Sequence, residues 1–151
     1  MLHIQDSIER TLVLPADPLT VWNRSFGSAD ALASWFPQRI EGDYSPDGTF
    51  HLIWGEHRSQ AKIVEWEVGR ALAFQWHPGD AHELDAFPES ELTTVRFTLA
   101  PSPDGTQVTM IESGFSRIAQ SRRDWALGQN TGGWDEELAK LLPTYAGSRS
   151  E

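Results

Sequence analysis

Two groups of histidines lie close to carboxylates in this 151-residue sequence, and that combination of side chains can bind zinc or iron. The groups are His77, His82 and Glu83, and His51, His57 and Glu56. A spacing of five residues in a loop does not by itself bring two imidazoles together, and the sequence fixes no third ligand. We therefore expect no metal and no other cofactor, and we interpret these histidines as surface or hydrogen-bonded side chains.

Other ionisable side chains lie within predicted strands, where alternation decides which face each one occupies. Glu112 shares its parity with Val108 and Met110, so we expect it to point inward, near the mouth of any cavity. There a carboxylate would have a shifted pKa and could act on a ligand. Arg96 and His51 alternate with apolar neighbours and are expected on the outer face, where Arg96 could alternatively form a cross-strand ion pair with Glu112.

No arrangement typical of covalent catalysis or phosphate binding is present in the sequence. Because there is no cysteine, a thiol nucleophile, a thiolate zinc site and a disulfide framework are excluded. No serine lies in the glycine pattern of a nucleophile elbow, and no glycine-rich phosphate loop occurs. The one basic cluster, Arg117, Arg122 and Arg123, is interpreted as a solvated helix face. We therefore assign no catalytic residue.

The charge and the composition of the chain limit the kinds of molecule that it can bind. Asp and Glu outnumber Lys and Arg by 22 to 12, giving a formal net charge of −10, which argues against binding of nucleic acid. A hydrophobic content of 39% is typical of a globular protein. No apolar run approaches the ~20 residues that span a bilayer, and the N-terminus lacks the pattern of a signal peptide. We expect a soluble, cytoplasmic protein without membrane insertion.

The first part of the chain is predicted to form a strand and two short helices. Residues 7–14 carry the apolar positions of a strand. Asp17 and Pro18 predict the start of a helix, because Asp is a favourable N-cap and Pro is tolerated at the first helical position. A second short helix is expected after Ser28, and Pro37 should end it.

The middle of the chain is predicted to form antiparallel hairpins. The tetrapeptide Ser-Pro-Asp-Gly occurs at 45–48 and at 102–105, and each copy predicts a tight turn in which glycine takes a positive φ. Alternation of apolar and polar residues predicts strands over 39–44, 49–54, 58–66, 71–76, 93–100 and 106–114. Residues 77–91 carry five acidic residues and no Lys or Arg, so we interpret them as a long solvated loop, either a mobile insertion or a functional one.

The C-terminal part is predicted to be helical. Apolar residues recur there at the spacing of one helix face, namely Trp134, Leu138, Leu141, Leu142 and Tyr145. The start of this helix is left open, because residues 122–129 also look helical and the glycines at 132–133 would either interrupt or cap it. Pro143 is expected to end or kink the helix. Residues from about 146 to 151 are expected to form a disordered tail.

Together these elements predict an α+β fold in a single domain spanning residues 1–151. A curved antiparallel sheet of about six strands would wrap around the long C-terminal helix, with two short helices after the first strand closing one end. Because such surfaces cannot touch everywhere, a cavity is expected between them. The alternative is that large aromatic rings fill that interior.

The residues expected to line the cavity come from the sheet and the last helix. They are Phe50, Trp54, Trp66, Phe74, Trp76, Phe97, Met110, Glu112, Trp134 and Leu138, with Tyr145 as a further member. Trp35 and Phe36 are expected near the short helices, where they would plug that end or act as a gate.

Five segments also occur in an order that suggests a known family. They are 15–22, beginning Pro-Ala-Asp-Pro; 35–37, Trp-Phe-Pro; 64–76, with a Gly-Arg-Ala-Leu turn; 106–115, ending Glu-Ser-Gly-Phe; and 133–134, Gly-Trp. In this order they resemble the START-like superfamily, also called helix-grip or SRPBCC, and within it the activator of heat-shock protein ATPase homologue-like family. The resemblance implies one START-like domain with a small-molecule cavity. It names no ligand, because the superfamily includes lipid carriers, plant hormone receptors, polyketide cyclases and co-chaperone domains.

Three functional hypotheses follow from the residues and the resemblance. The first is binding of an apolar or amphipathic small molecule between sheet and helix, as a carrier or sensor. The second is an enzyme of the cyclase or dehydratase type that uses Glu112, with Tyr44 or Gln60 nearby, as general acid and base. The third is a co-chaperone-like interaction with a heat-shock ATPase in a stress response. We expect a monomer or a homodimer.

Overall fold

The computed structural model describes residues 4–148. The longer elements are β1 (Ser7–Leu14), α1 (Pro18–Ser25), α2 (Ala29–Ala33), β2 (Arg39–Gly42), β3 (Thr49–Trp54), β4 (His57–Glu67), β5 (Ala71–Trp76), β6 (Thr93–Ser102), β7 (Gly105–Ser113) and α3 (Gln120–Leu138). The short 3-10 helices are η1 (Glu89–Glu91), η2 (Phe115–Arg117) and η3 (Leu142–Ser148). The order of strands and helices is the predicted one.

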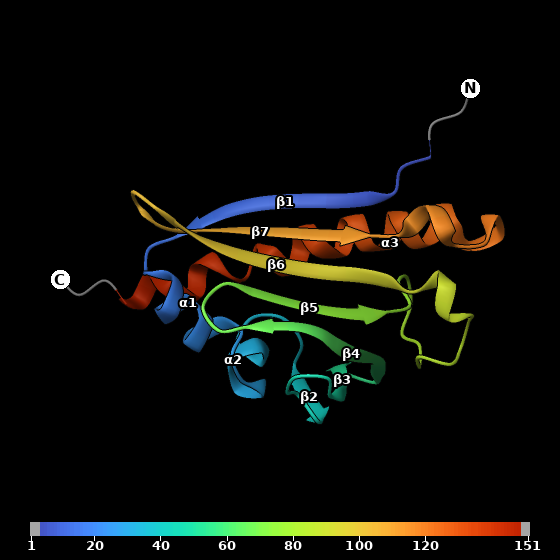
Figure 1. The fold of residues 1–151 in the computed structure, drawn as a ribbon, viewed down its shortest axis with the longest axis horizontal. Helices are drawn as coiled ribbons and strands as arrows, with labels where there is room; N and C mark the ends of the chain where they lie inside the picture. Colours follow the sequence, from blue (N-terminus) through green and yellow to red (C-terminus); the bar gives the residue numbers. More distant parts are fainter. Residues whose placement is uncertain (1–3, 149–151) are drawn as a thin grey trace.

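The strands of residues 4–148 form one antiparallel sheet in the order β1-β7-β6-β5-β4-β3-β2. The sheet has seven strands instead of about six, because β1 pairs along its length with β7, from Ser7 opposite Ser113 to Leu14 opposite Thr106. Figure 1 shows α3 crossing the sheet on one face, with α1 and α2 at one end. This is an α+β helix-grip fold of the START-like type.

Both early helices begin where their capping residues predict. The side chain of Asp17 accepts a hydrogen bond from the backbone N–H of Thr20 at 3.4 Å, and Pro18 occupies the first turn of α1. The Ser28 hydroxyl accepts a hydrogen bond from the backbone N–H of Ala31 at 3.0 Å at the start of α2. These caps fix the two short helices against the end of the sheet.

The two Ser-Pro-Asp-Gly turns differ in their backbone. In the second copy Gly105 has a φ of 139°, as predicted, but in the first copy Asp47 takes the positive φ of 63°. Aspartate tolerates the left-handed region better than most residues. Gly48 is required for a different reason, because a Cβ there would lie 2.2 Å from the carbonyl oxygen of Asp43.

The C-terminal helix begins at Gln120, a start that the sequence left open, and it ends earlier than the apolar spacing predicted. α3 runs through Gly132 and Gly133 without interruption and ends at Leu138. A helix continuing further would bring the ring of Pro143 against the carbonyl of Ala139. The prediction of one helix face from Trp134 to Tyr145 is therefore wrong beyond Leu138.

Residues after α3 still contribute to the core, from the turn that follows the helix and from η3. Leu141 and Tyr145 are buried, whereas Leu142 is 48% exposed. The tail expected from about residue 146 falls partly on residues 149–151, which lie outside the described residues; η3 extends to Ser148. Within residues 4–148, no helix has both the length and the apolar character needed to cross a membrane.

Candidate functional site

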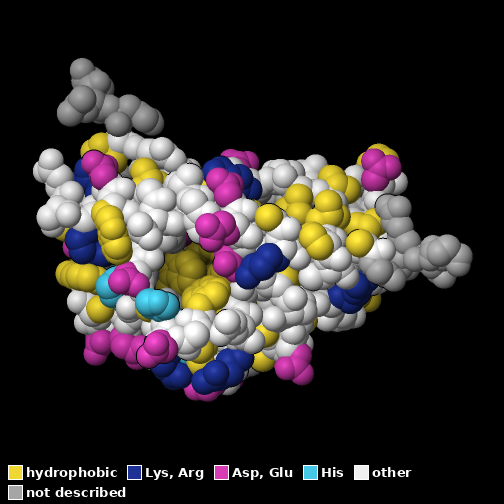
Figure 2. Space-filling view, turned by 180° about the vertical axis from the view of Figure 1, so that it is seen from behind, with side chains coloured by type: hydrophobic (Ala, Val, Ile, Leu, Met, Phe, Trp, Pro, Cys, Tyr) yellow, Lys and Arg dark blue, Asp and Glu magenta, His cyan; other side chains and the backbone are white. Residues whose placement is uncertain are grey.

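An open pocket of about 390 Å³ lies between the C-terminal half of α3, strands β4 and β5, and the start of the loop 77–91. Figure 2 shows this face of the molecule hollowed, with hydrophobic side chains at the bottom and acidic and histidine side chains around the opening. The pocket is lined by Phe36, Trp54, His57, Ser59, Trp76, His77, Pro78, Gly79, Asp80, Ala81, Gln129, Asn130, Gly133, Trp134, Glu136 and Glu137.

Four aromatic side chains form the walls of the pocket. Trp54 ends β3, Trp76 ends β5, Trp134 lies on α3, and Phe36 follows α2. The ring of Phe36 lies 5.0 Å from that of Trp134 and 5.4 Å from that of Trp54, and the rings of Trp76 and Trp134 are 6.1 Å apart. These spacings are those of mutually packed aromatic rings. The walls therefore form a continuous aromatic surface.

Glu112 holds two of these walls in place from behind. It lies on β7 with no exposed surface and is not among the residues that line the pocket. Its carboxylate accepts hydrogen bonds from the indole N–H groups of Trp76 and Trp134, each at 2.8 Å. It also accepts from the Thr93 hydroxyl at 2.5 Å and from the Asn130 side-chain amide at 2.8 Å. Glu112 is thus a positioning residue for the pocket.

The protonation of Glu112 is governed by opposing effects. Burial raises the pKa of this carboxyl group, because removal from water disfavours the charged form. The hydrogen bonds from Thr93, Asn130, Trp134 and Trp76 act in the opposite direction and lower it, but burial is the larger effect. In the acid form, the Thr93 hydroxyl could accept a hydrogen bond from the carboxyl O–H, whereas the two indole N–H groups can only donate.

Asn130 joins α3, the sheet and the loop 77–91 at the edge of the pocket. Its side-chain oxygen accepts a hydrogen bond from the backbone N–H of Gly79 at 2.9 Å, while its amide nitrogen donates to Glu112. Gly79 has a φ of 103°, and a Cβ there would lie 2.7 Å from the ring of Trp125. Glycine is therefore required for the loop to approach α3 this closely.

Two buried nitrogen atoms of the pocket residues have no hydrogen-bond partner in the protein. They are Nε1 of Trp54 and Nδ1 of His77. The other ring nitrogen of His77, Nε2, lies 3.0 Å from the carbonyl oxygen of Leu84 and 3.1 Å from that of Phe87, so it carries the proton and donates. Both unpaired atoms are covered by neighbouring protein atoms, so they lie within the wall and do not face the open space.

The sequence was compared with models of known protein families. A family model described as Activator of Hsp90 ATPase homolog 1-like protein matches residues 15–146. The chain belongs to this family. No curated protein matches the sequence.

Solved structures similar to this family member share its fold at low sequence identity. Protein MLL2253 from Mesorhizobium loti is 18% identical with a TM-score of 0.75, over 95% of this chain and 99% of that one. The Aha1 dimer from Colwellia psychrerythraea is 16% identical with a TM-score of 0.74, over 97% and 100%. CalU16 from Micromonospora echinospora is 22% identical with a TM-score of 0.69, over 95% and 76%. At these identities the likeness shows the fold alone.

In this member of the Activator of Hsp90 ATPase homolog 1-like family, only some of the residues expected around a cavity meet at the pocket. Trp54, Trp76 and Trp134 line it, together with Phe36 from the expected gate. Other expected residues are packed in the core away from it, namely Phe50, Trp66, Phe74, Phe97 and Met110. Leu138 lies at a separate apolar groove with Leu12, Pro15 and Leu142.

The core residues do not reach the pocket because aromatic neighbours fill the interior around them. The ring of Phe97 lies 5.1 Å from that of Phe26, and the ring of Trp66 lies 5.3 Å from that of Trp22. Trp35 is 3% exposed and donates its indole N–H to the carbonyl oxygen of Ser25 at 2.9 Å. The sequence left two alternatives for the interior, a cavity or filling by aromatic rings. Rings fill one end of the molecule, and a pocket remains at the other.

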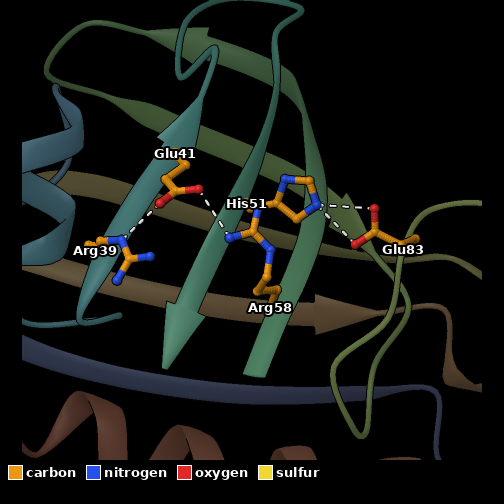
Figure 3. Close-up of polar contacts among 5 residues, drawn as sticks. All are labelled: Arg39, Glu41, His51, Arg58 and Glu83. Atoms are coloured by element: carbon orange, nitrogen blue, oxygen red, sulfur yellow. Dashed lines mark hydrogen bonds and ion pairs between the residues drawn. The ribbon is translucent and has the colours of Figure 1, made fainter. Parts of the chain in front are cut away.

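The remaining ionisable residues form mainly ion pairs at the surface. His51 lies on the outer face of β3 and pairs with Glu83 of the loop 77–91 at 2.9 Å, beside the Arg39–Glu41–Arg58 network (Figure 3). Among residues 4–148, no three His, Asp or Glu side chains gather as a metal site would require.

Arg96 lies on the outer face, as its alternation predicts. It pairs with Glu65 at 2.7 Å, and the alternative ion pair with Glu112 is wrong, because Glu112 stands opposite Val95 in the β6–β7 register. Tyr44 and Gln60 also lie away from Glu112: the Tyr44 hydroxyl donates to the carbonyl of Phe26, and Gln60 accepts from the backbone of Leu84.

The loop 77–91 is fastened to its surroundings, and part of the basic cluster does this. Arg122 pairs with Glu91 at 2.7 Å, and its guanidinium lies 3.5 Å from the centre of the Phe87 ring. Arg117 donates to the carbonyl oxygens of Ser90 and Leu92. The cluster is therefore not simply a solvated helix face, since it holds the loop that supplies one side of the pocket.

Sequence reasoning missed several residues of the pocket, most importantly Asn130 and Gly133. A usable signal was present, because the buried positions of α3 are Ala126, Asn130, Trp134 and Leu138, spaced four apart. Extending the apolar spacing backward from Trp134 reaches Asn130, a polar side chain on a buried face. Such a residue needs a hydrogen-bond partner, and the partner here is Glu112.

Proposed function

We propose that this protein binds a small molecule with an apolar body and a polar head in the pocket between α3 and the sheet, as a carrier or sensor. The observation that carries the proposal is the open pocket of about 390 Å³. Two of its aromatic walls are held in place by hydrogen bonds to the buried carboxylate of Glu112. Ligand pockets of roughly 300–1,000 Å³ with apolar walls and a few polar groups are typical of small-molecule sites.

The polar residues of the lining support a ligand that is not purely apolar. Ser59, Gln129 and Asn130 line the pocket beside its aromatic walls. Ligand sites combine apolar walls with a few polar groups that orient the ligand, which favours a molecule with a polar head.

Two glycines of α3 provide a matched experiment. Gly133 lines the pocket and its neighbour Gly132 does not, and a Cβ at either position would meet no atom within 4 Å. We expect Gly133→Leu to fill the pocket and Gly132→Leu to leave it open, with both variants folded. The measurement is titration calorimetry with a hexyl series: 1-hexanol, hexylammonium and hexanoate.

The expected result is that at least one member of the series binds the parent protein and Gly132→Leu, and that Gly133→Leu abolishes this binding. Circular dichroism confirms the fold of each variant. If no member of the series binds, or if Gly133→Leu binds as well as the parent, the pocket is not the binding site and the proposal fails.

The enzymatic alternative has less support in the geometry. It requires two ionisable groups that converge on a ligand inside the cavity. Glu112 is sequestered behind the walls by its own hydrogen bonds, and Tyr44 and Gln60 contact other residues. The structure thus places none of the three expected groups on the pocket surface.

Interaction with a protein partner is the second candidate, and the family description favours it. That description names an activator of the Hsp90 ATPase. Pull-down with Hsp90 at low and high salt tests the candidate, and a salt-sensitive complex is expected because the formal net charge of this chain is −10. Absence of a complex at low salt would leave small-molecule binding as the sole proposal.

A further inference from the structure

We propose that the polar head of the ligand is a cation of the alkylammonium type. This inference rests on the proposed function and specifies its ligand class. It follows from the combination of aromatic walls and an acidic rim. Together they make the pocket complementary to positive charge and unsuited to a carboxylate.

The aromatic walls provide the first part of the argument. An ammonium group over the face of an indole or phenyl ring is attracted by the ring quadrupole, and tryptophan is the most effective of these rings. Trp76 and Trp134 direct their indole N–H groups to Glu112, so these positive edges are already engaged. A hydrogen bond from an indole N–H to a carboxylate also increases the electron density of the ring, which strengthens the attraction.

The charges around the opening provide the second part. Asp80, Glu136 and Glu137 line the pocket, and among its described lining residues there is no Lys or Arg. Glu137 is paired with Lys140 at 2.7 Å, so its charge is compensated. Asp80 lies 3.9 Å from His57, accepts a hydrogen bond from the backbone N–H of Ala81 and forms no ion pair with Lys or Arg among the described residues, and Glu136 is exposed. The rim therefore carries excess negative charge, which attracts a cation and repels a carboxylate.

The hexyl series tests this inference directly, because its members share one apolar chain and differ in the charge of the head. We expect hexylammonium to bind about tenfold more tightly than 1-hexanol, with hexanoate the weakest. If 1-hexanol binds as tightly as hexylammonium, or if hexanoate binds most tightly, the inference is overturned while the proposed function stands. If none of the three binds, the proposed function itself fails.

Two substitutions separate specific recognition from general attraction to an acidic protein. Glu136→Gln removes one charge at the rim, and Asp104→Asn removes one charge in the turn between β6 and β7 as the matched control. We expect Glu136→Gln to weaken hexylammonium binding about twofold to threefold at low salt, with no effect on 1-hexanol. Equal weakening by Asp104→Asn would mean that only the net charge matters, which contradicts the inference.

A substitution at Trp54 tests the contribution of the aromatic walls to binding. Trp54 is partly exposed, so Trp54→Leu is expected to fold while removing one ring from the walls. The affinity for hexylammonium should fall about threefold to tenfold, and the affinity for 1-hexanol should change much less. Equal losses for both ligands would show that Trp54 contributes only apolar surface, and would overturn the cation–π part of the inference.

Discussion

The two ends of the interface between α3 and the sheet use aromatic residues in opposite ways. At the end near α1 and α2, the rings of Phe26, Trp35 and Phe97 lie 5.1 to 5.9 Å from one another and fill the interior. At the other end, the rings of Trp76 and Trp134 stand 6.1 Å apart beside open space. The same residue types therefore build a solid core in one place and a pocket in the other.

The difference shows that curvature of the sheet is not enough to keep a cavity open. The pocket end has glycine where a side chain would enter the space, at Gly133 on α3. It also has Glu112, whose carboxylate holds the indoles of Trp76 and Trp134 in place. At the packed end the rings of Phe26, Trp35 and Phe97 lie against one another instead.

The largest expected effect comes from removing a ring at each end. Phe97→Ala should lower the free energy of unfolding by about 3–5 kcal/mol, because it leaves a cavity in a closed core. Trp54→Ala should cost only about 1–2 kcal/mol, because one side of that ring already faces the pocket. Denaturant unfolding measures both. Similar losses at the two sites would remove the distinction between a packed end and an open end.

The next effect concerns Glu112 and its pH dependence. Burial raises the pKa of this carboxyl group above its ordinary value of 4.5, so ionisation costs more in the folded than in the unfolded protein. This contribution lowers the stability of the parent protein as the pH rises from about 4.5 toward the raised pKa. Glu112→Gln should destabilise the protein by about 1–3 kcal/mol at pH 4, and the difference from the parent should shrink at higher pH.

Asp6 is the matched control for Glu112, because its shift has the opposite sign. The hydrogen bond from the Ser116 side chain lowers the pKa of Asp6. Its stabilising contribution is present above the unfolded value and is lost as the pH falls through the folded pKa. The destabilisation by Asp6→Asn should therefore shrink toward low pH. Chemical unfolding at several pH values checks both slopes, and slopes of the same sign would contradict the assignment of Glu112.

An effect of comparable size is expected at the loop that borders the pocket. Gly79→Ala should cost about 1–3 kcal/mol, because φ is 103° and a Cβ would press on the ring of Trp125. Gly55→Ala is the control: φ is also positive, at 58°, but no atom lies within 4 Å. Thermal unfolding should rank Gly79→Ala as the more damaging change. The reverse order would mean that the close approach of loop and helix is not needed.

Local rules in the sequence predicted most of the fold. The Asp17 and Ser28 caps, the two turn tetrapeptides and strand alternation placed the strands and the early helices, since each is decided by residues close in the chain. The end of α3 was misplaced, because the apolar spacing continued past Leu138 while the ring of Pro143 did not allow the helix to follow.

The site was harder to predict because it depends on contacts between distant segments. Alternation placed Glu112 inward on β7, but its partners Trp76 and Trp134 come from β5 and α3. The open space beside these rings depends on Gly133, and this glycine does not signal the role within its local sequence.

The most direct test of the account is the response of the tryptophan indole N–H signals to a ligand, measured by 1H–15N NMR during titration with hexylammonium. The account predicts that the signals of Trp54, Trp76 and Trp134 at the pocket shift, while those of Trp22 and Trp35 in the packed end stay unchanged. Shifts of Trp22 and Trp35 as large as those at the pocket, or no shift of any of the three pocket signals, would contradict it.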